Sequence, residues 1–118
     1  MILHTNLKHV ETAEQYDDLL REHENVMICC GRMGPMCVPV YQAMIELESS
    51  HPRIAFRDFA FNTPDAQVIR SLPECRGFMG LPFTVYYKNG KVVEATSGIQ
   101  SKEQVKDILD RLFKDQAI

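Results

Sequence analysis

The C-terminal third of the chain contains the feature that most constrains the fold, a pair of strand-like segments separated by a tight turn. Phe83–Tyr87 and Val92–Ser97 are rich in β-branched and aromatic residues, and Asn89-Gly90 lies between them. Asn-Gly is the strongest short signal for a β-hairpin, because both residues tolerate the positive φ that such a turn needs. The sequence therefore predicts two neighbouring antiparallel strands here.

Earlier segments alternate between strand-like and helix-like patterns. Val26–Cys30 is a short, continuous apolar run, which is typical of a strand buried on both faces. Ile54–Phe61 predicts a second strand, with apolar residues on both sides that indicate a bulge or burial on both faces. An extra strand is expected at Ile2–Thr5. Strands that are joined through helices run parallel, so the sheet is predicted to be mixed.

Helices are predicted by apolar spacing and by capping signals. Capping boxes at 12–15 and 101–104 each begin a segment with a helical apolar face, and 37–50 has the same spacing. Thr63-Pro64 begins a further helix that Leu72-Pro73 ends. The order α β α β α β β α predicts one α/β domain over residues 1–118, with a mixed central sheet, a C-terminal antiparallel hairpin and helices on both faces.

Composition narrows the classes of function. A net charge of −3 offers no basic stripe for nucleic acid. No apolar run approaches the roughly 18 residues that span a membrane, and the first residues lack the pattern of a secretory signal. We therefore expect a cytoplasmic monomer without a nucleic-acid partner, a membrane partner or a cofactor.

The chain has four cysteines, at Cys29, Cys30, Cys37 and Cys75. A permanent disulfide framework is uncommon in the cytoplasm, because cellular thiols keep such bonds reduced. The cysteines also lack the paired Cys-x2-4-Cys spacing of zinc sites, so we expect no metal. Thiol chemistry is the interpretation that remains.

Two local motifs resemble thioredoxin. Gly34-Pro35 lies between a buried strand and a long helix, as the active-site Gly-Pro of that family does, and Gly80–Gly90 resembles its stretch from the cis-proline through the hairpin. The resemblance covers the chain from about residue 10 and includes the order of elements. It implies a thioredoxin-like fold, a cis peptide bond before Pro82, and a protein or peptide partner that carries thiol or disulfide groups.

The active-site residues of that family are changed in this chain. Aligned on Gly34-Pro35, its two redox cysteines fall on Met33 and Met36, and its buried aspartate falls on Met27. The ordinary Cys-x-x-Cys mechanism is therefore absent. The sequence is compatible with a thiol-disulfide oxidoreductase of atypical cysteine spacing, with a redox sensor that uses a single thiol, and with a non-catalytic binding module.

Cys37 is the predicted nucleophile, because the free N–H groups and the positive dipole end of a helix start stabilise a thiolate. An inert, space-filling cysteine is the alternative. Cys30 is the predicted resolving thiol, and Cys75 is the alternative partner, since it precedes the loop that contains Pro82. Cys29 and Cys30 point to opposite faces of their strand, and Cys29 is assigned to the core.

The resemblance also implies a groove in which an extended peptide pairs with the residue before Pro82. The residues predicted to contact this peptide are Met33, Gly34, Pro35, Met36, Leu81 and Pro82, with Phe78 and Met79 extending the patch. Arg57 and Asp58 are charged residues within a predicted strand. One of them is a candidate for the buried charge that Met27 cannot supply; a strand edge facing water is the alternative.

Overall fold

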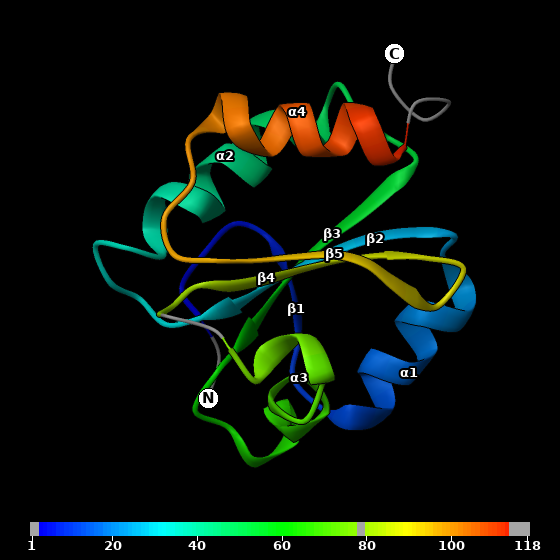
Figure 1. Ribbon diagram of the computed structural model, residues 1–118, viewed down its shortest axis with the longest axis vertical. Coiled ribbons are helices and arrows are strands. Elements are labelled where there is room, and N and C mark those ends of the chain that lie inside the picture. The colour runs from blue at the N-terminus through cyan, green and yellow to red at the C-terminus, as the bar shows by residue number, and fades with distance from the viewer. Residues whose placement is uncertain (1–2, 78–79, 114–118) are drawn as a thin grey trace.

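The computed structural model describes residues 3–77 and 80–113 (Figure 1). Within these residues a five-stranded sheet has the order β1-β3-β2-β4-β5. Its strands are β1 (Lys8–Val10), β2 (Asn25–Gly31), β3 (Ile54–Ala60), β4 (Phe83–Lys88) and β5 (Lys91–Ser97). β1, β3 and β2 run parallel, whereas β4 is antiparallel to both β2 and β5. The predicted mixed sheet with a C-terminal hairpin is confirmed.

Helices cover both faces of this sheet, as predicted. α2 (Val38–Glu48) and α4 (Lys102–Leu112) lie on one face, and α1 (Ala13–Glu22) and α3 (Gln67–Arg70) lie on the other (Figure 1). The helix expected after Thr63 is divided into α3 and two short 3-10 turns, η1 (Pro64–Ala66) and η2 (Pro73–Cys75). Across the described ranges, none of the helices has the length and apolar character needed to cross a membrane.

Local sequence signals set the boundaries of several elements. The side chains of Thr12 and Ser101 accept hydrogen bonds from the N–H groups of Gln15 and Gln104, at 3.0 and 3.1 Å, and both capping boxes are complete. In the hairpin, Asn89 and Gly90 have φ values of 54° and 79°. Both values are positive, as a tight turn between right-twisted strands requires.

The expected strand at Ile2–Thr5 is wrong for the part of that range that the structure describes. Ile2 lies outside the described residues, and Leu3–Thr5 do not form a strand. The Thr5 hydroxyl accepts a hydrogen bond from the N–H of Leu7 at 3.1 Å, which closes a local turn. The chain enters the sheet only at β1, which pairs with β3.

The sheet separates two layers of buried side chains. We call the first the α2/α4 layer; from the strands and the start of α2 it includes Met27, Cys29, Phe56, Tyr86 and Cys37. The second, the α1/α3 layer, includes Val26, Ile28, Cys30, Phe59 and Cys75. Successive residues of β2 alternate between the two layers, because side chains alternate across a strand. β3 is likewise buried on both faces, as its pattern predicted.

Candidate functional site

Cys37 is the N-cap residue of α2, and it is 3% exposed. The N–H groups of Cys37 and Val38 both donate to the carbonyl of Gly34, at 3.1 and 3.0 Å. Pro39 has no N–H, and the N–H of Val40 donates to the carbonyl of Cys37 at 3.0 Å. Cys37 therefore lies at the helix start, as expected, but the N–H groups expected to face its sulfur are bonded to carbonyls.

A surface hollow of about 390 Å³ lies beside Cys37. Its lining residues are Arg32, Gly34, Pro35, Met36, Cys37 and Leu81. Most of the predicted peptide contacts are therefore gathered around Cys37, and Met33 lies in the same loop with 45% of its surface exposed. Pro82 is buried next to Leu81, and the peptide bond between them is cis. Phe78 and Met79 lie outside the described residues.

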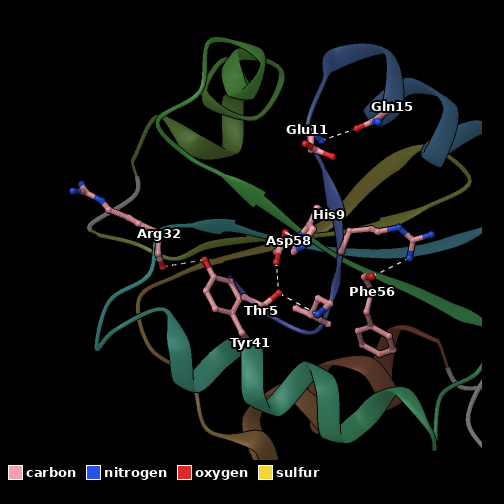
Figure 2. A network of polar contacts seen from close by, with 10 residues as sticks. Thr5, His9, Glu11, Gln15, Arg32, Tyr41, Phe56 and Asp58 are labelled. Carbon is pink, nitrogen blue, oxygen red and sulfur yellow. Dashed lines mark hydrogen bonds and ion pairs between the residues drawn. The ribbon is translucent and has the colours of Figure 1, made fainter. Parts of the chain in front are cut away.

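Gly31 ends β2 next to the sulfur of Cys37. A Cβ atom built on Gly31 would lie 2.8 Å from Cys37 Sγ, 2.8 Å from Tyr41 Oη and 3.3 Å from Cβ of Pro82. Because glycine has no Cβ, these three side chains can meet at one point. The Tyr41 hydroxyl donates to the Arg32 carbonyl at 3.2 Å, which ties α2 to the loop (Figure 2).

Cys30 and Cys75 lie in the α1/α3 layer, on the opposite face of the sheet from Cys37. Burial raises the pKa of the Cys30 thiol to about 12, and the nearby Cys75 adds to this rise. Burial also raises the pKa of Cys75. The short separation in sequence suggested that Cys30 could reach Cys37, and the position of Cys75 before the Pro82 loop suggested the same for Cys75. The alternation of β2 instead places Cys30 on the face opposite Cys37. The structure does not bring Cys37 together with either predicted partner.

Cys29 shares the α2/α4 layer with Cys37. Burial raises the pKa of Cys29 well above its ordinary value, and the Thr84 hydroxyl, which donates to Cys29 Sγ at 3.8 Å, opposes that rise. The sequence alone predicted only core packing for Cys29. The signal that could have linked it to the site is the period of two along β2, which puts Cys29 and Gly31 on the same face.

Asp58 is a carboxylate buried near these groups, with 1% of its surface exposed. It is the register partner of Cys29 across β2 and β3. The Thr5 hydroxyl donates to its Oδ2 atom, and Nδ1 of His9 lies 2.7 Å from its Oδ1 atom (Figure 2). Burial raises the pKa of Asp58, whereas the bonds from Thr5 and His9 oppose the rise. Of the two candidates for a buried charge, Asp58 therefore occupies the α2/α4 face, and the Arg57 guanidinium instead donates to the Phe56 carbonyl at 2.9 Å.

Comparisons with known proteins identify the fold. Neither the models of protein families nor the curated proteins include a match to this sequence. Oxidised thioredoxin from Plasmodium falciparum is 16% identical, with a TM-score of 0.73 over 91% of this chain and 98% of its own. Thioredoxin f2 from Chlamydomonas reinhardtii is 13% identical, with a TM-score of 0.75 over 92% and 97%. Mitochondrial thioredoxin 3 from Saccharomyces cerevisiae is 17% identical, with a TM-score of 0.71 over 88% and 94%. The chain therefore has a thioredoxin-like fold.

Proposed function

We propose that this chain is a thiol-based redox protein that exchanges thiols and disulfides with a protein or peptide partner through Cys37. The position of Cys37 supports this proposal most directly. It begins α2 and lines the hollow together with the preceding loop and Leu81, so a partner bound in the hollow lies next to this residue. Met33 and Met36, which are 45% and 49% exposed, offer flexible apolar contacts to such a partner.

The proposed reaction begins with the thiolate of Cys37, which attacks one sulfur of a partner disulfide. A bond forms between Cys37 and that sulfur, the partner's S–S bond breaks, and its second sulfur leaves as a thiolate. A second thiol of the chain then attacks Cys37, which releases the partner as a thiol and leaves the chain oxidised. The sequence-based prediction for this second thiol is Cys30, with Cys75 as the alternative.

The proposed location, oligomeric state and lack of a cofactor follow the expectations from composition. The protein acts as a monomer in the cytoplasm and needs no bound cofactor, because the two electrons come from its own thiols. The Leu81–Pro82 segment, at the edge of the hollow, positions an extended partner by pairing with its backbone.

A non-catalytic binding module is the second candidate, and one observation favours it. All four cysteines are buried and free. In that case the hollow would bind a partner segment through apolar contacts alone. A redox sensor, in which Cys37 forms a mixed disulfide without turnover, is the intermediate case.

Reaction with oxidised glutathione tests the proposal. We expect mass mapping to find Cys37 in a disulfide that dithiothreitol reverses, and we expect Cys37→Ser to prevent this modification. Circular dichroism checks that Cys37→Ser is folded, since the new hydroxyl lies at a buried position. Reduction of a model disulfide substrate such as insulin, lost in Cys37→Ser, would then distinguish an enzyme from a sensor. Four unmodified thiols in the native protein would contradict both and leave the binding module.

A further inference from the structure

We propose that Cys29 is the resolving thiol, the cysteine that attacks Cys37 after Cys37 has formed a mixed disulfide. This inference rests on the proposed function and assigns its second step to a residue for which the sequence predicted only a place in the core. Cys29 and Cys37 belong to the same α2/α4 layer, whereas Cys30 and Cys75 belong to the α1/α3 layer. The sheet backbone therefore separates Cys37 from Cys30 and Cys75, but not from Cys29.

The geometry of β2 places Cys29 on the face of the sheet that meets the sulfur of Cys37. Gly31 lies two residues after Cys29 and faces the same side of the sheet. The Cβ position of Gly31 is 2.8 Å from Cys37 Sγ. Two residues along a strand span about 6.6 Å, so Cys29 lies one strand repeat from the point where the Cys37 sulfur meets β2.

The hydroxyl of Tyr41 lies near the same end of β2 as the sulfur of Cys37. This hydroxyl also lies 2.8 Å from the Cβ position of Gly31. After burial, the thiolate charges of Cys29 and then Cys37 contribute most to the raised pKa of Tyr41. Cys29 and Cys37 are therefore both near the Tyr41 hydroxyl, and all three residues belong to the α2/α4 layer.

Formation of the bond requires Cys37 and Cys29 to approach each other. The Cβ atoms of a disulfide are about 3.8 Å apart, so Cys37 must move toward β2 from its N-cap position. The loop that leads into Cys37, residues 32–36, is mostly exposed, so it is less constrained by packing than β2.

The step is balanced without a further reactant. The sulfur of Cys29 attacks Sγ of Cys37, a Cys29–Cys37 bond forms, and the bond between Cys37 and the partner breaks. The proton of Cys29 passes to the leaving sulfur, which departs as a thiol. Over both steps two thiols of the chain are oxidised, and one partner disulfide is reduced to two thiols. The Thr84 hydroxyl donates to Cys29 Sγ and stabilises the charge that develops there.

Neighbouring alanine variants provide a matched test, because Cys29 and Cys30 are adjacent, equally buried and on opposite faces. The full chain, Cys29→Ala and Cys30→Ala are each treated with oxidised glutathione, quenched with acid and mapped by mass spectrometry. We expect the wild type and Cys30→Ala to form a Cys29–Cys37 disulfide and to release glutathione. Cys29→Ala should keep a glutathione bound to Cys37.

The possible outcomes separate the two proposals. A Cys30–Cys37 or Cys37–Cys75 bond in the wild type, or equal retention of glutathione by both alanine variants, would overturn the role of Cys29 and leave Cys37 as the nucleophile. Absence of any disulfide at Cys37 in every protein would overturn the proposed function, and the role of Cys29 with it. The wild-type map requires no substitution, so the test stands even where Cys29→Ala does not fold.

Discussion

The two faces of β2 are both fully buried, but they bury different chemistry. On the α1/α3 face, Cys30 packs among aliphatic and aromatic side chains, and the hydroxyls of Tyr16 and Tyr87 bond to each other at 2.9 Å. On the α2/α4 face, Cys29 lies beside the hydroxyl of Thr84 and opposite the carboxylate of Asp58. Buried polar groups lower stability unless they are bonded. The hydroxyls of Tyr16 and Tyr87 satisfy each other, whereas the polar groups on the α2/α4 face include a carboxylate and a hydroxyl that contacts a thiol.

The largest effect that we expect is a loss of stability when a buried leucine is shortened, and it should be similar in both layers. Leu19 of α1 and Leu109 of α4 are 5% and 0% exposed, and each lies in one layer. Leu19→Ala and Leu109→Ala should each lower the free energy of unfolding by about 3 kcal/mol, because each removes apolar contacts and leaves a cavity. Urea denaturation measures both values. A difference of more than about 2 kcal/mol between them would show that the layers also differ in apolar packing.

The next largest effect is a pH dependence of the free energy of unfolding that comes from Asp58, on the α2/α4 face. Burial raises the pKa of Asp58 in the folded protein above its unfolded value of about 3.9. The folded state therefore holds this proton more tightly than the unfolded state. The stabilisation is fully present below the unfolded pKa and is lost as pH rises through the folded pKa, by about 1.4 kcal/mol for each pH unit that separates the two pKa values. Asp58→Asn should remove this slope.

Urea denaturation across this pH range compares the wild type with Asp58→Asn. Asp107→Asn is the matched control, because Asp107 is an exposed residue of α4 and its loss leaves the slope from Asp58 in place. Equal slopes in the wild type and Asp58→Asn would mean that the buried carboxylate does not distinguish the two faces.

The helix starts and the hairpin could be predicted from the sequence, because short local motifs determine them. Thr12, Ser101 and Asn89-Gly90 act on residues next to them, so the helix starts and the hairpin follow from short motifs. The extra N-terminal strand could not be excluded in this way, because a side-chain bond to the Leu7 N–H competes with the strand.

The site depends on contacts between distant segments, and most of these could not be predicted. The partners of Asp58, Thr5 and His9, are 53 and 49 residues away in sequence. The sequence favoured Cys30 over Cys29 because Cys30 ends the predicted strand, whereas Cys29 lies nearer its middle. The structure places Cys29 in the same buried layer as Cys37 and Cys30 in the opposite layer.

The smallest effect expected is at Thr84, and it tests whether the polar face acts on the reaction. Thr84→Val removes the hydroxyl that donates to Cys29 Sγ, and it should lower the free energy of unfolding by less than about 1 kcal/mol, because sulfur is a weak acceptor. That hydrogen bond lowers the pKa of Cys29 against the effect of burial, so its loss should raise the pKa further. Release of glutathione from Cys37, followed by quenched mass spectrometry, should become slower.

Tyr87→Phe is the control on the opposite face, because it removes a buried hydroxyl that bonds to Tyr16 rather than to a thiol on the α2/α4 face. We expect this variant to release glutathione at the wild-type rate. Equal rates in the wild type and Thr84→Val would contradict the role given to the hydroxyl. A similar decrease in Tyr87→Phe would mean that both layers influence the thiols, and the two faces of β2 would then differ in composition but not in function.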